Sequence, residues 1–333
     1  MATLGTGAGN LLDVSSLFGA DGKELRVAEV LNQVNDIVQD MPMVEGTDSD
    51  GLQAAMRSGL PSVTWPRFNE GVQPSKGTLV NVKFATGTMS TVSNVDCRLA
   101  KKYSDPEAYR ASQDKAHIEA LGQEMARAVF YESETTNPGR FTGLSSYFNS
   151  LSAENADQII DAAGTGSDNT SIWVVCWSPE AVTGIYPKGS KAGLEVRNMG
   201  EQLVVDSTGI NGSTYLGYQT RFLWDVGLAV QDWRQVVRIC NIDHSNLVTN
   251  SSAADLPKLL SRAVDMINNP GAGKMCIYSR RDVAAVLNEQ ALARVSNGGG
   301  VSYENVDGKV VKMWRGIPLR RCDALTKTEA RIT

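Results

Sequence analysis

The chain has 333 residues, and its hydrophobic fraction of 42% and charged fraction of 21% exclude global disorder. Its net charge of −5 excludes the basic excess typical of proteins that coat nucleic acid. The longest apolar runs are about five residues, far short of the roughly 20 in a membrane-spanning helix, so we expect no membrane segment. The first ten residues lack the basic and apolar regions of a secretion signal, and we expect a protein made in a cytoplasm.

Residues 1–50 are expected to form an N-terminal arm. Residues 1–21 are rich in Gly, Ala, Ser and Thr, which predicts a segment that is flexible or needs a partner for its order. Residues 22–40 predict an amphipathic helix, because apolar side chains recur on one face at the helical period. That face consists of Val27, Val30, Leu31, Val34, Ile37 and Val38. Pro42 is expected to end the helix.

Residues 51–103 predict an extended β-hairpin loop. Prolines and glycines divide the segment into short runs. In one run Val80, Val82 and Phe84 alternate with polar residues, which is typical of a strand with two different faces. The segment holds too few large apolar residues for a core of its own, so we expect it to lean on something else, such as another chain.

Residues 104–132 predict the longest helix. Ser104 and Glu107 have the spacing of a capping box, and Pro106 suits the first helical turn. One face would carry Ala111, Ile118, Leu121, Met125 and Val129. At 1.5 Å per residue such a helix is roughly 40 Å long, which favours a structural spine.

The remaining chain mixes strands and helices. Residues 137–170 predict loops with a short helical patch near 156–163. The later elements are expected as strands at 171–177, within 214–243, at 275–279, and in VKMW and IPLRRC, and as helices at 255–269 and 281–294. The alternation of helix and strand after residue 250 predicts a compact α/β subdomain.

The sequence offers few side chains for chemistry. The five cysteines are Cys97, Cys176, Cys240, Cys276 and Cys322. They are widely spaced and form no CxxC pair, so we expect buried free thiols rather than disulfides or a zinc site. His117 and His244 have no fixed partner in the sequence and are expected to be surface or interface side chains. NPGAGKM at 269–275 lacks the P-loop spacing and predicts a turn. We expect no catalytic residue, cofactor or metal ion.

Five stretches, taken in order, resemble the major capsid proteins of short-tailed, double-stranded DNA bacteriophages. They are LPSVTWPRFNEGVQPSKGT at 60–78, EAYRASQDKAHIEALGQEMARAVFYES at 107–133, FTGL at 141–144, RRDVAAVL at 280–287 and WRGIPLRRCDAL at 314–325. Each is a packing or turn motif, and their order and spacing carry the resemblance. It implies an α+β protein with the Hong Kong 97-type capsid fold.

That fold implies a division of the chain. The expected parts are an N-terminal arm at 1–50, an extended loop at 51–103, a peripheral domain at 104–249 with its spine helix at 104–132, an axial α/β domain at 250–325 and a C-terminal tail at 326–333. The family returns to its peripheral domain by a strand pair after the axial domain. The best candidate here, residues 227–243, precedes that domain, which leaves a rearranged connectivity open.

The resemblance also implies a function. Copies of the chain would form pentamers and hexamers of an icosahedral shell around the phage genome, in a virion assembled in the host cytoplasm. Implied partners are further copies, a separate scaffolding protein, a portal, a decoration or cement protein, and packaged double-stranded DNA in non-specific contact. Two alternatives stay open: an encapsulin-type shell of the same fold around a cargo enzyme, and an α/β enzyme with a site at 171–178 and 275–282.

The extended loop is where we expect contacts between subunits. The candidate residues are Trp65, Arg67, Phe68, Glu70, Val72 and Lys76. The apolar three would anchor on a neighbour's spine helix, because large aromatic side chains dominate such contacts. The charged three would pair across the rim and set the register more than the affinity. In the alternative, Trp65 and Phe68 pack within their own chain.

Overall fold

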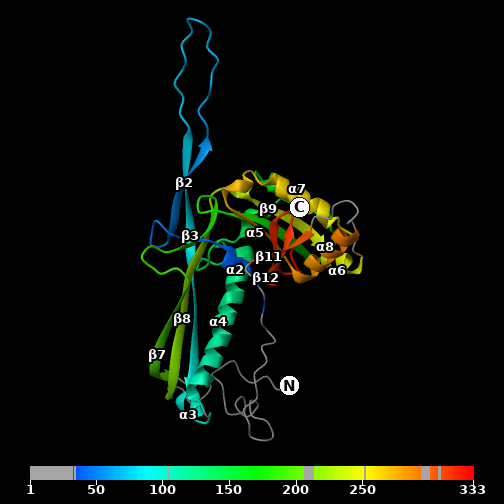
Figure 1. Ribbon diagram of the computed structural model, residues 1–333. Helices are drawn as coiled ribbons and strands as arrows, with labels where there is room; N and C mark the ends of the chain where they lie inside the picture. The colour runs from blue at the N-terminus through cyan, green and yellow to red at the C-terminus, as the bar shows by residue number, and fades with distance from the viewer. Residues whose placement is uncertain are drawn as a thin grey trace. The chain divides into compact units, whose positions relative to one another are not determined.

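The computed structural model describes residues 33, 35–103, 105–205, 214–250, 253–293, 301–306 and 309–333. The chain divides into two compact units. Unit 1 takes the described residues within Met1–Val34, Thr88–Met125 and Gly193–Trp224, and unit 2 takes those within Asn35–Gly87, Ala126–Ala192 and Asp225–Thr333. Three long elements contribute residues to both units, namely β3 (Thr78–Asp96), α4 (Pro106–Tyr131) and β8 (Thr214–Val230) (Figure 1).

The first sheet has the strand order β1-β6-β8-β3-β2, and β7 also pairs with β8. Besides β3 and β8, its strands are β1 (Met43–Glu45), β2 (Gly51–Gly59), β6 (Val182–Tyr186) and β7 (Leu194–Val205). β2 and β3 form the predicted hairpin, antiparallel from the Gly51–Ala85 pair to the Gly59–Thr78 pair. The alternation expected in β3 is confirmed at Lys83 and Phe84, because Phe84 is buried while Lys83 is exposed, but it is wrong at Val80, which is 51% exposed.

The second sheet, in unit 2, has the strand order β11-β12-β13-β10-β5-β9-β4. Its strands are β4 (Ile159–Asp161), β5 (Asn169–Trp177), β9 (Val236–Asp243), β10 (Lys274–Ser279), β11 (Val301–Val306), β12 (Lys309–Trp314) and β13 (Ile317–Arg321). Every residue of β5 is buried, as the apolar run SIWVVCW predicted. A strand in this position has both faces covered, so it is apolar throughout rather than alternating.

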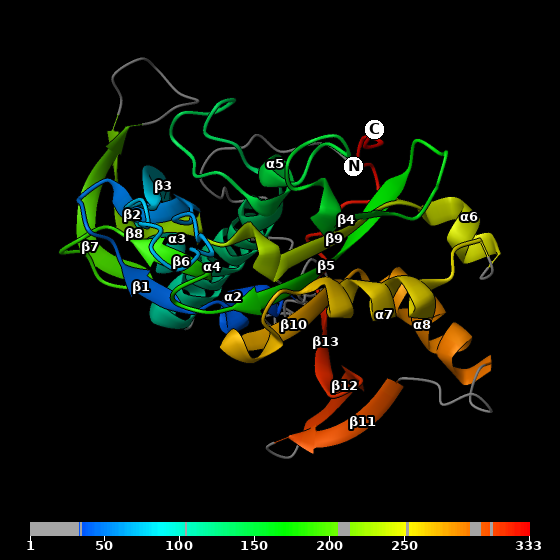
Figure 2. The ribbon, with the colours of Figure 1, turned by 90° about the horizontal axis from the view of Figure 1, so that it is seen from above.

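Helices cover one face of this sheet. The remaining α-helices in the described residues are α2 (Ile37–Asp40), α3 (Cys97–Ala100), α5 (Leu144–Tyr147), α6 (His244–Thr249), α7 (Leu256–Met266) and α8 (Arg281–Ala293). α7 and α8 lie along the sheet, where Leu260 and Leu287 share a core cluster with Val174 (Figure 2). α7 begins where the helix at 255–269 was predicted to begin, since the Asp255 carboxylate caps it by accepting a hydrogen bond from the backbone N–H of Lys258 at 3.2 Å.

Aromatic side chains fill the opposite face. The ring of Phe130, at the C-terminal end of α4, lies 6.0 Å from the ring of Trp173 on β5 and 6.3 Å from that of Tyr278 on β10. Phe148 meets Trp173 edge-on at 6.0 Å. Two of these three pairs have the edge-to-face arrangement that is favourable for aromatic rings, and the Phe130–Trp173 pair is tilted by 39°. They fix the end of the long helix against the sheet within unit 2.

The N-terminal helix prediction is wrong at Asn35 and Asp36. The described part of residues 22–40 contains α2, and the rest of the predicted helix lies outside the described residues. Asn35 forms an antiparallel bridge with Cys322, and its side-chain oxygen accepts a hydrogen bond from the backbone N–H of Ala324 at 2.9 Å. A partner 287 residues away has overridden the local apolar period.

The predicted spine helix is present as α4. Asp105 accepts hydrogen bonds from the backbone N–H groups of Glu107 at 3.0 Å and Ala108 at 3.2 Å, so Asp105 caps the helix, whereas the predicted capping residue Ser104 lies outside the described residues. A carboxylate at this position also suits the helix dipole. On the predicted apolar face Met125 is buried, whereas Ile118 is 43% exposed.

Two predictions need correction, and some strands were not predicted. The helical patch near 156–163 is one turn of 3-10 helix at Ala156–Gln158 followed by β4. Residues 227–243 are not a strand pair, because β8 and β9 belong to different sheets. The Asp232 side chain accepts a hydrogen bond from the backbone N–H of Arg234 and caps a 3-10 turn between them. β6, β7 and β11 were not predicted at all.

The domain borders drawn from the sequence stay predictions, although one sheet joins β5 and β9 to β10 and β13 across the border placed at 249/250. The five cysteine thiols are buried and free, as expected. Burial raises the pKa of Cys240 and of Cys276 to about 11, so both stay protonated near neutral pH. Within the described residues, no helix is long and apolar enough to cross a membrane.

Candidate assembly surface

The base of the hairpin is anchored within unit 2. Leu52 on β2 and Phe84 on β3 form a buried cluster with Ile185 and Ala229. A Cβ atom at Gly51 would lie 2.0 Å from the carbonyl oxygen of Phe84, so only glycine permits this approach of the two strands. The two strands of the hairpin are therefore packed into unit 2 at their base.

Residues 60–77, which connect β2 to β3, are called the tip segment below. All of them are exposed. The Ser75 hydroxyl donates a hydrogen bond to the carbonyl oxygen of Ser62 at 2.9 Å, which holds the two legs together. At the turn, the backbone N–H of Arg67 donates to the Glu70 carboxylate at 3.0 Å, and Asn69 has a φ of 70°. Asparagine tolerates this left-handed conformation better than most residues.

The apolar residues predicted to bind a neighbour lie together on the tip segment. Trp65 is 96% exposed, Phe68 102% and Val72 60%. Trp65 and Phe68 therefore do not pack against the described residues of their own chain, as the alternative prediction required. The prediction missed Leu60, 81% exposed, and Val63, 86% exposed. The sequence could have identified both residues, because they lie within five residues of Trp65 in the same segment, LPSVTW.

The charged members of the predicted set, Arg67, Glu70 and Lys76, are exposed on the same segment. One carboxylate oxygen of Glu70 accepts the hydrogen bond from the Arg67 backbone N–H at the turn. Glu70 therefore stabilises the turn, a local role that the sequence did not predict. An exposed apolar surface of this kind, edged by charges, is typical of a protein–protein contact.

Within unit 1, α4 covers a sheet face formed by β3, β7 and β8. His117 Nδ1 lies 2.8 Å from the Thr91 hydroxyl, and its ring stacks on Phe222 at 6.1 Å. The Arg110 guanidinium lies 4.5 Å from the ring of Tyr218. His117 therefore has the partner that the sequence did not show. Ile118, on the exposed side of the helix, is available to a neighbouring chain.

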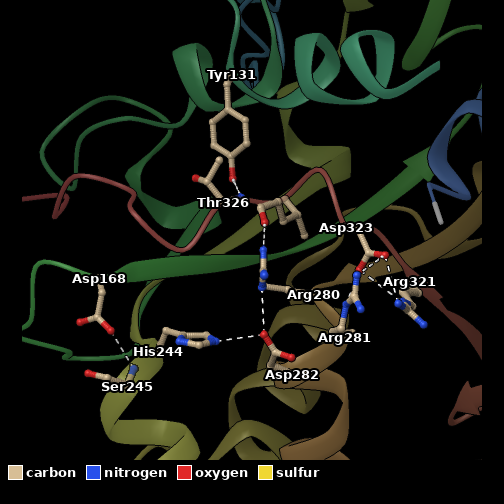
Figure 3. Close-up of polar contacts among 11 residues, drawn as sticks. Tyr131, Asp168, His244, Ser245, Arg280, Arg281, Asp282, Arg321, Asp323 and Thr326 are labelled. Atoms are coloured by element: carbon tan, nitrogen blue, oxygen red, sulfur yellow. Dashed lines mark hydrogen bonds and ion pairs between the residues drawn. The ribbon is translucent and has the colours of Figure 1, made fainter. Parts of the chain in front are cut away.

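In unit 2, polar contacts tie α6 and α8 to the chain after β13 (Figure 3). His244 Nε2 lies 3.1 Å from the Asp282 carboxylate, which also accepts a hydrogen bond from Arg280 Nε at 3.0 Å. Arg280 Nη1 donates to the carbonyl oxygen of Leu325 at 2.9 Å. Asp323 accepts paired hydrogen bonds from Arg281 at 3.1 and 3.0 Å and from Arg321 at 3.2 and 3.1 Å. His244 is thus a structural side chain with a fixed partner.

Replacing Asp282 by asparagine is expected to weaken the acid dependence of stability. Partial burial raises the pKa of Asp282, but hydrogen bonds from His244 and Arg280 outweigh it and hold the pKa below 3.8. A depressed pKa contributes stability above pH 3.8 that is lost as the pH falls through the folded value. The variant should therefore be less stable at pH 7 and differ less at pH 3, by chemical denaturation. Asp265→Asn, at an exposed position of α7, is the matched control, and an equal loss at both pH values would contradict this assignment.

The C-terminal segment is built into the core of unit 2. Arg238 donates to the Glu329 carboxylate at 2.7 Å, to the Ser171 hydroxyl at 3.0 Å and to the Phe148 carbonyl at 2.7 Å. Tyr131 and Ser171 also donate to Glu329. Burial and the negative charge of Glu329 raise the pKa of Tyr131, which keeps its hydroxyl a donor. The predicted tail at 326–333 thus completes a buried network.

One protein family and one solved structure match this chain over nearly all of its length. The family described as major capsid protein GP7 matches residues 19–333. A chain of bacteriophage Epsilon15 is 30% identical, with 100% of both chains covered and a TM-score of 0.77. Two more distant structures have TM-scores of 0.44. One is the holo-SrpI encapsulin complex of Synechococcus elongatus PCC 7942, 12% identical over 71% of this chain and 96% of that chain. The other is from Mycobacterium phage Adephagia, 11% identical over 70% of this chain and 98% of that chain.

The search of curated proteins found no match. The family match covers far more than half of the chain, and the Epsilon15 chain aligns end to end, so the fold and the family agree. The match to the Epsilon15 chain includes the exposed tip segment, the long helix and both sheets. The α+β fold is of the Hong Kong 97 type, and the chain belongs to the GP7 family of major capsid proteins.

Proposed function

We propose that this major capsid protein assembles into pentamers and hexamers, which together form an icosahedral shell around the double-stranded DNA of a phage. Its family gives it the role of shell-forming component of a virion. The observation that carries the finer proposal is the tip segment, whose large apolar side chains are uncovered by their own chain. A monomer rarely exposes such residues together unless they bind a partner.

In the proposed contact, the tip segment of one subunit lies on the α4 helix of the next. Trp65 and Phe68 supply the buried apolar area, and Val72 extends it. Arg67, Glu70 and Lys76 lie at the rim and select the register through charge. The hairpin and the helix are different surfaces, so the contact is head-to-tail, and head-to-tail contacts close into rings when the rotation from one subunit to the next divides a full turn.

The proposed partners follow from a shell of this kind. They are further copies of the chain, a separate scaffolding protein, a portal and a decoration protein, with packaged DNA in non-specific contact. The net charge of −5 does not favour tight binding to the phosphates of DNA. A weakly binding shell suits a genome that has to be packaged into the shell and later released from it. We propose a structural role without catalysis, cofactor or metal.

Electron microscopy and size-exclusion chromatography of the chain, expressed alone and with its neighbouring phage genes, test this function. We expect closed shells, or rings of five and six subunits in solution, because the tip segment gains its burial only between chains. A monomer or dimer that persists at high concentration in both expressions would contradict the proposal. It would also reopen the enzyme alternative at residues 171–178 and 275–282.

A further inference from the structure

β7 is a long edge strand in unit 1. Among the described strands, β8 is the partner of β7, and it lies along one side only (Figure 1). Nine of the twelve residues of β7 are exposed. Val196 is 53% exposed, Leu203 72% and Val205 66%. A long edge strand that carries apolar side chains is normally covered or interrupted in folded proteins. The reason is that its unpaired backbone groups are a template for another strand.

A bulge interrupts β7 at its middle, with six residues on each side of the Met199–Gly200 peptide bond. Asn198 pairs with Thr220 and Gly200 with Gln219, so Met199 is the extra residue. Gly200 has a φ of 72°, which a glycine adopts without strain. At the bulge, the Gly200 backbone N–H donates to the Asn198 side chain and the Met199 carbonyl accepts from the Gln202 side chain. Two backbone groups at the bulge therefore have side-chain partners within the same strand.

The bulge shifts the alternation of faces by one residue. On one side of it Leu194, Val196 and Asn198 pair with Trp224, Phe222 and Thr220 of β8, and on the other side Glu201, Leu203 and Val205 pair with Tyr218, Leu216 and Thr214. All these β8 residues have even numbers and share one face, so their six partners on β7 share it too. Along β7 this face reads apolar, apolar, polar, then polar, apolar, apolar. That order is unchanged when the strand is reversed.

We propose that β7 pairs antiparallel with β7 of a second copy of this chain about a two-fold axis through the bulge. In this register Leu194 faces Val205 of the second copy, Val196 faces Leu203, and Asn198 faces Glu201. In this register both members of each opposed pair project from the same face of the joined sheet. The exposed apolar side chains of the two copies therefore contact each other. On the other face, Arg197 lies opposite Gln202 and Glu195 opposite Val204, so no like charges are opposed.

The pairing has a distinct place in the shell, and in this respect it rests on the proposed function. The tip segment makes a head-to-tail contact that closes rings. A shell also needs a contact that joins one ring to the next. A two-fold contact uses the same patch on both partners, so each pair of β7 edges connects two subunits and leaves no edge open.

A cysteine pair tests both the contact and its register. In the Val196→Cys/Leu203→Cys chain, directly opposed Cα atoms lie about 4.5–5.5 Å apart, within the range of a disulfide. The two positions on one strand are roughly 23 Å apart, so they cannot bond within a chain. The five native thiols are buried and do not compete. We expect mild oxidation of assembled shells to give a covalent dimer on a non-reducing gel, and unassembled subunits to give none.

The single variants are the matched controls. Neither Val196→Cys nor Leu203→Cys should dimerise, because each faces the other position. A dimer from either single variant would show a different register, and double-cysteine shells without dimers would show a different occupant, such as a neighbour's hairpin. Both results overturn the proposal. Leu203→Lys should still form rings but at least tenfold fewer shells, and an unchanged shell yield would also overturn it. Absence of shells from the unaltered chain would instead contradict the proposed function.

Discussion

Replacing Trp65 and Phe68 together by alanine is expected to abolish shell formation without unfolding the protein. Their exposed fractions of 96% and 102% mean that truncation removes no described contact within the chain. At an interface, a buried aromatic anchor contributes on the order of 2–4 kcal/mol. A shell repeats the same contact in every subunit, so the loss recurs at each step of assembly. Thermal unfolding of the soluble subunit should be unchanged, while electron microscopy should show no shells.

Two further variants separate the anchor from the rim. Trp65→Phe keeps a large ring and should retain shells at a reduced yield. Arg67→Ala should change the rate of assembly and its dependence on salt more than its end point, because an exposed charge pair is worth about 0.2–1 kcal/mol. Shells from the double alanine variant at the unaltered yield would contradict the assembly surface. A marked fall in its melting temperature would show instead that these side chains pack within the chain.

Much of the fold follows from local pattern. The alternation at Val80, Val82 and Phe84 predicts β3, and the apolar run at 171–177 predicts the central strand β5. The tip segment was predictable because its large apolar side chains have no apolar neighbours in the sequence with which to form a core. These signals are local, since period and composition act over a few residues.

The sequence failed where distant residues decide the structure. Asn35 interrupts a helical pattern through a bond to Cys322 and Ala324, and no window of sequence contains both ends of that contact. β7 was missed because its bulge breaks the alternation at Gly200. The residues on each side of the bulge alternate as a strand does, but the two sides together match neither the two-residue period of a strand nor the 3.6-residue period of a helix. The tail at 326–333 was assigned from its position after the last strand, whereas its function in the core depends on Arg238, 91 residues earlier.

Replacing Glu329 by glutamine is expected to be the most destabilising single change that we describe. Side-chain exposure is 4% for Arg238 and 5% for Glu329, so the ion pair is screened little by solvent. The variant keeps the size of the side chain but leaves the Arg238 charge buried without its carboxylate. Such a loss costs about 3–5 kcal/mol, a large part of the 5–15 kcal/mol that stabilises a typical domain. Urea denaturation of the unassembled subunit measures the change.

The double variant Arg238→Met/Glu329→Leu shows whether the loss comes from the unpaired charge. Replacing a whole buried ion pair by apolar residues of similar volume is often close to neutral. Here the recovery should be incomplete, because the Phe148 carbonyl and the Ser171 hydroxyl lose the donor that Arg238 supplied. We therefore expect the double variant to be more stable than Glu329→Gln and less stable than the unaltered chain. A double variant as unstable as the single one would show that the network acts through its hydrogen bonds rather than through the pairing of its charges.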